Sequence, residues 1–455
     1  MKTIFITIFQ GAEAKNILRT DIYKNLIANE EARIVFFVDS QERAEYYRKE
    51  FSGDRVIYEV VANKMPKGLD AFFSQLSFIL LRTATTDLRR KMAAEESGQS
   101  RAGYFFARLL NYLLARPAFR KLARAADCLV VRDRSFAPYF DKYQPEVVFL
   151  AHLFDGEEVN ILREARRRGV RTIGFINSWD KLTARRALRL LPDSLVVFNN
   201  IVKLEAVKYA DMEEKNIFVS GIPQYDWHVN YQPVSRGEFC KKNRLDPAKK
   251  IIVYAPMGKT FSNSDWDVID PLNGSIVNGQ LSNAQLFVRF QPNDFVDEHE
   301  LKKREWLKYD YPGVRFSRKR GVNWDMSFDD IRGLTDTLAN ADVFVCYASS
   351  MSVDAAIFDK PVININFEVK EKQSLSKTPT LFYKTAHYGK ALKTGAMRLP
   401  ESEEELIRDI NQYLANPSLD REGRRCLINE QCGKLDGRAG KRIADFIWNI
   451  SRLRS

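Results

Sequence analysis

The chain has 455 residues, of which 45% are hydrophobic and 29% charged. This composition can fill packed cores, so it excludes a fibrous or broadly disordered protein, and the length favours two domains over one. The formal net charge is +12, and neither the five scattered cysteines nor the four dispersed histidines have zinc-site spacing. We therefore predict a protein of the reducing cytoplasm that holds no metal ion.

Short β-rich runs alternate with helical stretches along the first half of the chain, which is typical of a parallel sheet with crossover helices. The first apolar run, at 2–9, is too short to span a membrane and is predicted to be a buried strand, followed by a helix over 13–28. The same pattern predicts strands at 32–38, 56–60, 128–131, 147–151, 172–176, 195–198 and 217–219, and helices at 41–51, over most of 67–126 and at 157–168.

The second half repeats this alternation after a predicted linker near 230–248. Two successive β/α runs indicate an α/β protein with two Rossmann-like domains whose parallel sheets face each other across a cleft. We place the domains at 1–235 and 245–430, with 431–455 as a C-terminal helix that packs back on the first domain. The pattern predicts strands at 250–255, 286–290, 314–316, 343–347 and 362–365, and helices at 329–338, 352–358, 402–414 and 438–453.

Neither of the two common phosphate-binding motifs is complete in this sequence. After the first strand the chain has one glycine, Gly11, where a dinucleotide fingerprint needs three. Gly258-Lys259-Thr260 is similar to the end of a P-loop, but Val253 occupies the position of the required upstream glycine. Doubly wound sheets bind ligands beyond the carboxyl ends of their strands, so functional residues are expected at those ends.

A hydroxyl, a large aromatic ring and a carboxylate stand together after the strand at 172–176, as Ser178, Trp179 and Asp180. A sugar presents hydroxyl groups and apolar C–H faces, so this group suits an acceptor sugar, and Asp180 is the first candidate for a catalytic residue. The alternative is structural: Ser178 or Asp180 caps the next helix and Trp179 packs against its neighbours.

Two further segments of the first domain place polar residues at strand ends. His152 and Asp155 directly follow a predicted strand, and imidazole and carboxylate are the usual bases at neutral pH. Asp155 can equally cap the next helix, and a lone histidine is usually packed or solvated. The turn Gly221-Ile-Pro223-Gln-Tyr-Asp226 is tight enough to bring the backbone close to a ligand, although a plain connection explains the same residues.

In the second domain, Ser349 and Ser350 follow a predicted strand and begin a helix. Helix N-termini expose backbone N–H groups and carry about half a positive charge, so they bind phosphate without a special side chain. Asp354, one turn further on, either reaches a ribose hydroxyl or favours the helix dipole, and Glu368 follows the next strand at the same sheet edge. Serine is also a common N-cap, so a purely structural role is the alternative.

Lys259 and Arg289 are the basic candidates of the second domain. Both lie at the carboxyl ends of predicted strands, where they could pair with the two phosphates of a nucleotide. Arg289 offers a planar fork and Lys259 a point charge. The alternative for either residue is a surface ion pair that contributes little.

Positive charge is concentrated between Arg82 and Arg124, where ten Lys/Arg face three acids and contribute seven of the twelve net charges. Such a segment indicates a partner with phosphates, either an anionic membrane surface or a polyanionic substrate. Within it, residues 104–116 carry an apolar stripe flanked by arginines, as helices on anionic membranes do. The alternative buries that stripe in the domain core. We expect no nucleic-acid partner, because no nucleic-acid module accompanies the charge.

Taken in order, these segments resemble GT-B glycosyltransferases of bacterial surface-polysaccharide assembly, which carry S-W-D-N-x-T, G-x-P-Q-x-D, R-x-H-P and S-S-x-x-x-(D/E)-A…K-P-(V/I). The corresponding segments here are S-W-D-K-L-T at 178–183, G-I-P-Q-Y-D at 221–226, R-F-Q-P at 289–292, S-S-M-S-V-D-A at 349–355 and K-P-V at 360–362. Lys181 replaces the usual Asn, and Gln291 replaces the usual His, which excludes an imidazole at that position. The resemblance extends to teichoic-acid polymerases of the CDP-glycerol glycerophosphotransferase type and to UDP-GlcNAc 2-epimerases.

The resemblance implies a metal-independent glycosyltransferase that moves a sugar from a nucleotide-sugar donor to a saccharide or lipid-linked acceptor. The donor is a substrate, so no cofactor is implied. The two second-domain serines, with Lys259 or Arg289, would hold the nucleotide diphosphate, and the Ser-Trp-Asp group would present the acceptor. A lipid-linked acceptor would place the protein at the inner face of the membrane, with 82–124 as the contact. The alternatives are a CDP-glycerol-type phosphotransferase, a UDP-sugar epimerase and, from another class, a basic nucleic-acid-binding or non-catalytic partner protein.

Overall fold

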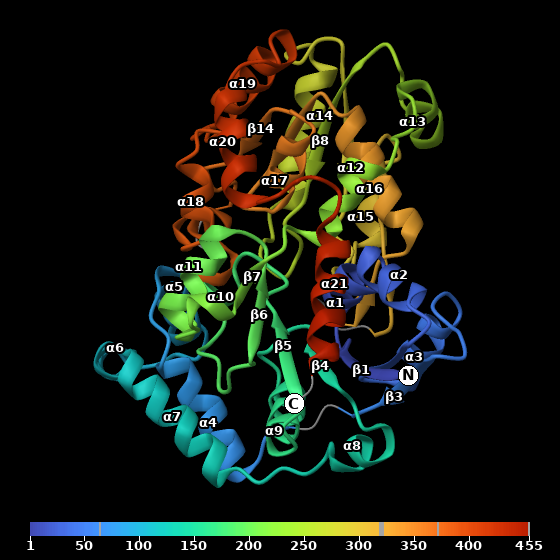
Figure 1. The fold of residues 1–455 in the computed structure, drawn as a ribbon. Helices are drawn as coiled ribbons and strands as arrows, with labels where there is room; N and C mark the ends of the chain where they lie inside the picture. Colours follow the sequence, from blue (N-terminus) through green and yellow to red (C-terminus); the bar gives the residue numbers. More distant parts are fainter. Residues whose placement is uncertain (63–64, 318–322, 371–372, 454–455) are drawn as a thin grey trace. The chain divides into compact units, whose positions relative to one another are not determined.

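The computed structural model describes residues 1–62, 65–317, 323–370 and 373–453 (Figure 1). The chain divides into two compact units. Unit 1 consists of 1–90, 98–229 and 433–455, and unit 2 consists of 91–97 and 230–432. Each unit contains a parallel sheet of its own, as the alternating pattern predicts.

Unit 1 has seven parallel strands in the order β3-β2-β1-β4-β5-β6-β7. Consecutive residues of β1 and β4 are buried, so both faces of the sheet are covered. β1 lies between β2 and β4, with Ile4 opposite both Ile34 and Val147. The strands are β1 (Lys2–Thr7), β2 (Ala32–Val38), β3 (Val56–Val60), β4 (Val147–Leu150), β5 (Arg171–Phe175), β6 (Ser194–Val197) and β7 (Ile217–Val219).

The helices that connect these strands depart from the prediction in two ways: the helices at 137–143, 181–184, 200–210 and 226–230 are not predicted, and one predicted helix is divided. The helix predicted over 13–28 is two helices, because Thr20 has an extended backbone and caps the second one, its Oγ1 accepting from Ile22 N at 3.3 Å. The helices are α1 (Gly11–Ile17), α2 (Asp21–Ala28), α3 (Gln41–Arg48), α8 (Ala137–Tyr143), α9 (Gly156–Arg167), α10 (Lys181–Ala184), α11 (Asn200–Ala210) and α12 (Asp226–Asn230).

The basic segment forms a group of helices: α4 (Gly68–Ile79), α5 (Ala84–Glu96), α6 (Arg101–Leu114) and α7 (Pro117–Val130). The strand predicted at 128–131 is wrong, because those residues continue α7 as far as Val130. A run of four apolar residues does not distinguish a strand from a helix. Asp127, in the last turn of α7, is held by ion pairs to Arg163 (2.7 Å) and Arg189 (2.8 Å), which fix that turn as helix.

Unit 2 has six parallel strands in the order β10-β9-β8-β13-β14-β15 and a separate antiparallel pair. The predicted strand at 314–316 lies in that pair and not in the parallel sheet, since Val314 is opposite Asp325. The strands are β8 (Lys250–Ala255), β9 (Ala284–Arg289), β10 (Lys308–Asp310), β11 (Val314–Arg315), β12 (Trp324–Asp325), β13 (Val343–Cys346), β14 (Val362–Asn364) and β15 (Met397–Arg398).

Unit 2 also contains helices within segments predicted to be loops. The predicted linker holds α13, whose N-terminus is closed by a reciprocal capping box between Ser235 and Glu238. The helices are α13 (Arg236–Asn243), α14 (Asp265–Val277), α15 (Glu298–Lys302), α16 (Phe328–Asn340), α17 (Met351–Ile357), α18 (Tyr388–Leu392), α19 (Glu403–Ala415) and α20 (Arg421–Gln431).

The last helix, α21 (Ala439–Arg452), packs on α2 within unit 1, where Figure 1 shows it in red beside the blue N-terminal segment. Asp226 caps it, because its carboxylate oxygens accept from Ala439 N (3.0 Å) and Gly440 N (2.7 Å). Among the helices of the described residues, none combines the length and the hydropathy that a membrane span requires.

Candidate functional site

The strand order of unit 1 reverses between β1 and β4, which are neighbours in the sheet. Loops that leave two such strands at their carboxyl ends turn to opposite sides, and doubly wound sheets bind ligands in the space between them. β1 leads into α1, and β4 leads into the segment that holds His152 and Asp155. The topology therefore predicts a site made by the residues that follow these two strands.

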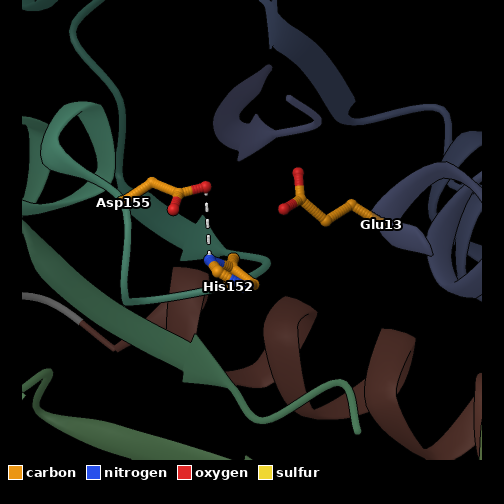
Figure 2. Close-up of side chains that lie close together, drawn as sticks. All are labelled: Glu13, His152 and Asp155. Atoms are coloured by element: carbon orange, nitrogen blue, oxygen red, sulfur yellow. Dashed lines mark ion pairs between the residues drawn. The ribbon is translucent and has the colours of Figure 1, made fainter. Parts of the chain in front are cut away.

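Three side chains point toward one another at this position, as Figure 2 shows: Glu13, His152 and Asp155. A nitrogen or oxygen atom of each lies within 4.8 Å of the corresponding atoms of the other two. His152 Nδ1 is 3.3 Å from Asp155 Oδ2, and Gln10 Nε2 donates a hydrogen bond to the same oxygen at 2.6 Å. Glu13 and His152 are buried, whereas the Asp155 side chain is 30% exposed. The aspartate is thus the member that a ligand can reach.

Helix capping places Glu13 in the cluster. It is the third residue of α1, and its Oε2 accepts from the backbone N–H groups of Phe9 (2.6 Å) and Gln10 (3.1 Å). The other oxygen, Oε1, is buried and has no hydrogen-bond partner among the residues described. Burial and the carboxylates of Glu158 and Asp155 raise the pKa of Glu13 well above its ordinary value. The site therefore favours the protonated form of Glu13.

Glu158, in the first turn of α9, joins the ends of the two strands. Its carboxyl group accepts from Thr7 Oγ1 and from the backbone N–H groups of His152 (3.0 Å) and Leu153. Burial and the charge of Asp155 raise the pKa of Glu158 to about 8. Leu153 has a φ of 65°, a conformation that costs a non-glycine residue about 1 kcal/mol or more and is concentrated at functional sites.

Lys181 supplies the positive charge of the cluster from the first residue of α10. It is buried, and its Nζ lies 2.5 Å from His152 Nε2. Burial and the neighbouring Arg185 lower the pKa of Lys181 to about 8. Burial and the Lys181 charge lower the pKa of His152 to about 4. The imidazole is therefore neutral at pH 7, and the lysine exchanges protons close to that pH.

With Glu158 and Lys181 the cluster has five ionisable groups, and their pKa values differ in direction and size. Burial opposes the negative charge of Asp155, but His152, Lys181 and Arg185 outweigh burial and lower its pKa. The cluster thus combines one ionised carboxylate, two carboxyl groups with raised pKa values, a neutral imidazole and a lysine with a pKa near neutrality. Groups whose pKa values are pushed apart within one buried site are characteristic of acid–base catalysis.

Glu13, His152 and Asp155 also offer the donor set of a divalent-cation site, one imidazole and two carboxylates. Lys181 opposes a cation there, because its ammonium group contacts His152 and would be repelled by a metal ion. The absence of a metal ion from the working protein stays a prediction.

The Ser-Trp-Asp group follows the adjacent strand β5, which pairs with β4. Asp180 is the N-cap residue of α10 but makes no side-chain capping bond, and Ser178 Oγ donates to Asp180 Oδ1 at 2.6 Å. All three side chains are half-buried. Lys181, the next residue, links this group to the cluster. Asn177, just before it, is buried, and its amide nitrogen and oxygen have no hydrogen-bond partner among the residues described.

The turn that contains Gly221, Pro223 and Asp226 follows β7 and contacts the C-terminal segment of unit 1. Gly221 has a φ of 85°, and a Cβ there would lie 2.7 Å from the carbonyl oxygen of Lys434, so the close approach requires glycine. Pro223 is buried at the start of a 3₁₀ turn, and Asp226 caps α21. A binding role for these residues stays a prediction.

The strand order of unit 2 reverses between β8 and β13, so the loop at 256–260 and the start of α17 lie at its switch point. Ser350 is the exposed N-cap residue of α17. Ser349 Oγ accepts from Met351 N at 3.2 Å, and Asp354 is buried within the helix. Two of the predicted phosphate-binding segments therefore share one edge of this sheet.

Two aspartates hold the loop at 256–260. Asp265 accepts from the backbone N–H of Gly258 (2.9 Å), and Asp294 accepts from the backbone N–H of Lys259. Gly258 has a φ of 80°, and a Cβ there would collide with the Asp294 carboxylate. The N–H groups that would bind phosphate in a P-loop thus have carboxylate acceptors of their own. Only the Lys259 side chain of this loop offers positive charge to a ligand.

The charged candidates of unit 2 have partners within the unit. Arg289 is buried in an ion pair with Asp310, and burial lowers the pKa of Arg289. To bind a phosphate it would have to leave this carboxylate. Glu368 Oε1 accepts from Thr380 N (3.0 Å) and Oγ1 (2.7 Å). The Lys259 side chain is half-exposed, and its Nζ lies 3.6 Å from Asp297 Oδ2.

The model of the CDP-glycerol:poly(glycerophosphate) glycerophosphotransferase family matches residues 190–449, more than half of the chain. The chain belongs to this family. In this glycerophosphotransferase-family protein, the matched range includes the loop at 256–260 and the start of α17. It does not reach the unit 1 cluster, which lies between Glu13 and Lys181.

Other comparisons show which proteins this family member is similar to. It is 25% identical over 183 residues to the hydrolysing UDP-N,N'-diacetylbacillosamine 2-epimerase of Legionella pneumophila, a match that spans 40% of this chain and 45% of that protein. A UDP-GlcNAc 2-epimerase from Neisseria meningitidis bound to UDP-GlcNAc has a TM-score of 0.56 at 10% identity, covering 99% of this chain and 100% of that one. The wall teichoic acid polymerase TagF, soaked with CDPG, has a TM-score of 0.52 at 12% identity, covering 99% and 88%. These likenesses confirm the predicted GT-B frame of two parallel-sheet α/β domains.

The sequence alone does not single out Glu13 or Glu158. It draws attention to Lys181 only because this lysine replaces the asparagine that is usual in the GT-B glycosyltransferases that the chain resembles. Glu13 and Glu158 are first-turn acids of two helices, which are common and usually exposed. The signal that could have found them is positional, because each follows one of the two strands at the switch point by a few residues.

Proposed function

We propose that this protein is a transferase that moves a group from a nucleotide-activated donor to a hydroxyl group of a cell-surface polymer acceptor. The observation that carries this proposal is the buried cluster at the switch point of unit 1, in a chain of the glycerophosphotransferase family. An acceptor hydroxyl loses a proton as it attacks the donor, and groups with pKa values near neutrality are suited to that proton transfer.

Asp155 contacts the acceptor hydroxyl in this proposal, because it is the partly exposed member of the cluster. His152 lies behind it, between Asp155 and Lys181, and provides a route for the proton into the cluster. Lys181, with a pKa of about 8, exchanges that proton near neutral pH. Asp180 lies beside this route and, with Trp179, orients the acceptor.

A nucleotide sugar is the donor predicted from the sequence, and CDP-glycerol is the second candidate, favoured by the family match. The two reactions break different bonds. Sugar transfer breaks the bond between the sugar carbon and the phosphate oxygen and releases a nucleoside diphosphate. Glycerophosphate transfer breaks the phosphoanhydride bond and releases a nucleoside monophosphate. In both, the acceptor oxygen forms the new bond and its proton passes to the enzyme.

The released nucleotide therefore tests the proposal. The protein is incubated with UDP-sugars or with CDP-glycerol, with and without a membrane fraction that carries polymer acceptor, and the nucleotides are separated by chromatography. Acceptor-dependent UDP indicates glycosyl transfer, and acceptor-dependent CMP indicates glycerophosphate transfer. UDP released without any acceptor would indicate a hydrolysing epimerase and contradict the proposal, as would turnover of none of these donors.

Variants then test the assigned residues. Asp180→Asn is expected to abolish transfer while leaving the fold and nucleotide binding intact. Ser350→Ala combined with Lys259→Ala is expected to weaken donor binding in calorimetry. Normal turnover in the first variant, or unchanged donor affinity in the second, would remove those residues from the proposed site.

We also propose that transfer needs no metal ion, because Lys181 and the helix N-termini at the strand ends supply the positive charge. EDTA is then expected to leave the rate unchanged. A loss of activity that Mg²⁺ or Mn²⁺ restores would contradict this and would point to Glu13, His152 and Asp155 as ligands. Contact with a membrane, where a lipid-linked acceptor would lie, also belongs to this proposal.

A further inference from the structure

Helix α6 of unit 1 has an inverted arrangement, with a polar side chain facing the protein and apolar side chains facing outward. Asn111 is buried, and its Nδ2 donates to the carbonyl oxygens of Ile79 (2.6 Å) and Leu81 (3.0 Å). Phe105 and Phe106, by contrast, are 63% and 62% exposed. A surface helix in water normally directs its apolar stripe inward. The burial therefore contradicts the alternative that this stripe lies in the domain core.

The outward side chains of α6 share one arc of the helix. They lie at positions i, i+1, i+4, i+7 and i+8, a spacing that keeps side chains on one side of an α-helix. All five are exposed, and they are Phe105, Phe106, Leu109, Tyr112 and Leu113.

Helix α7 repeats the inversion next to it. Arg120 and Asp127 are buried in ion pairs of 2.6 and 2.7 Å, whereas Leu122 and Leu129 are 66% and 77% exposed. α4 packs on both helices (Figure 1). It adds the exposed Phe72. With roughly 200 Å² of surface for each aromatic side chain, these helices expose more apolar area than the few hundred Å² usual for a monomer.

Eight of the ten basic residues of the segment fall into two sets. One set bonds to groups of the protein itself and consists of Arg89, Arg90, Arg120 and Arg124. The other is exposed on α6, α7 and the bend between them and consists of Arg101, Arg108, Arg116 and Lys121. Asp127, the one acid of these two helices, is buried. The outward surface of α6 and α7 therefore carries positive charge alone.

The exposed arginines border the apolar arc. Arg101 precedes Phe105 by four residues and Arg108 precedes Tyr112 by four, so each pair lies on the same side of α6. Arg82 places its guanidinium over the Tyr112 ring, 4.8 Å from the ring centre. An apolar band edged by bases matches the cross-section of a bilayer surface, where acyl chains lie below anionic headgroups.

We propose that the outward face of α6 and α7 is a docking surface for an anionic lipid bilayer. The apolar side chains would enter the boundary between headgroups and acyl chains, and the exposed bases would pair with lipid phosphates. A second copy of this chain is a poorer occupant, because two such faces would bring their positive charges together. The inference rests on the proposed function only in giving a lipid-linked acceptor as the reason for docking.

Vesicle sedimentation of the full chain tests the docking surface. The protein is expected to sediment with vesicles that contain phosphatidylglycerol and to stay in solution with phosphatidylcholine alone. Phe105→Ser with Phe106→Ser is expected to lower the affinity at least about tenfold. Arg101→Gln with Arg108→Gln is expected to lower it about fivefold per base and to weaken the dependence on salt. Val277→Ser, at a 78% exposed apolar position of unit 2, is the matched control and should bind as the unmodified chain does.

Three results would overturn the inference: sedimentation with neither vesicle type, equal sedimentation with both, or unchanged binding by both double variants. A dimer in analytical ultracentrifugation that the phenylalanine variant converts to monomer would also overturn it, since the face would then bind a second copy. Circular dichroism should show that these exposed substitutions leave the fold intact. If no donor is turned over, the proposed function fails while the vesicle result stands by itself.

Discussion

At the switch point of unit 2, Asp265 accepts hydrogen bonds from Tyr254 Oη (3.1 Å), Met257 N (3.0 Å) and Gly258 N (2.9 Å). At the switch point of unit 1, Glu13 keeps one carboxyl oxygen buried with no hydrogen-bond partner in the described parts of the chain. A carboxylate thus follows a switch-point strand in each of the two parallel sheets, but its hydrogen bonding differs between them. The carboxylate that has hydrogen-bond partners on both oxygens holds a loop, whereas burial and two neighbouring carboxylates raise the pKa of Glu13 well above its ordinary value.

The strongest test of this contrast is removal of the unit 1 lysine. Lys181→Ala is expected to lower the transfer rate about 10²- to 10⁴-fold, because the cluster loses its one lysine, a group whose pKa is about 8. The rate is measured by release of the nucleotide, with the fold checked by circular dichroism. Lys203→Ala, which removes a half-buried lysine paired with Glu214, is the control. A rate within twofold of the unmodified protein would show that the cluster takes no part in transfer.

At the switch point of unit 2, the loss of a charged side chain is expected to lower the stability of the fold. Asp265→Ala leaves the N–H groups of Met257 and Gly258 without their acceptor and should lower the free energy of unfolding by about 1–3 kcal/mol. Urea denaturation measures this difference. Asp246→Ala, at an exposed position of the same unit, is the comparison. Equal stability of the two variants would contradict the structural role assigned to Asp265.

The third test concerns the pH dependence of stability. The pKa of Glu158 is about 8 in the folded protein and 4.5 for a free side chain, so its contribution to stability is complete below about pH 4.5 and is lost as the pH rises toward 8. Glu158→Gln cannot ionise. The variant is therefore expected to lose less stability than the unmodified chain between about pH 5 and about pH 9. Parallel pH curves for the two proteins would mean that Glu158 ionises normally.

Much of the fold follows from local sequence patterns. β-rich runs such as 32–38 and 147–151 alternate with helical stretches, and this period identifies both sheets without any long-range information. The errors occur where the pattern is short or interrupted. A four-residue run at 128–131 fits a strand or a helix equally, and Thr20 ends a helix that its neighbours would continue. The long-range ion pairs of Asp127 decide the first case, and the local cap of Thr20 on Ile22 N decides the second.

The site was predictable only in part. His152 and Asp155 are recognisable because they follow a strand, but their pKa values depend on Lys181 and Arg185, which are far from them in sequence. The stripe at 104–116 could be seen as apolar, yet its direction is set by Asn111, whose partners are carbonyl groups of α4 and of the residues after it. Burial and long-range proximity determine both features, and neither can be derived from spacing alone.

The capping of α21 by Asp226 has a consequence for how the protein is made. Residues 230–432 emerge from the ribosome before α21 exists, so that stretch can fold during translation. Unit 1 has to wait, with Asp226 and the surface of α2 uncovered, until the helix that closes it has been synthesised. A fragment that stops at residue 229 would therefore remain permanently in that unfinished state, and aggregation would be its expected fate.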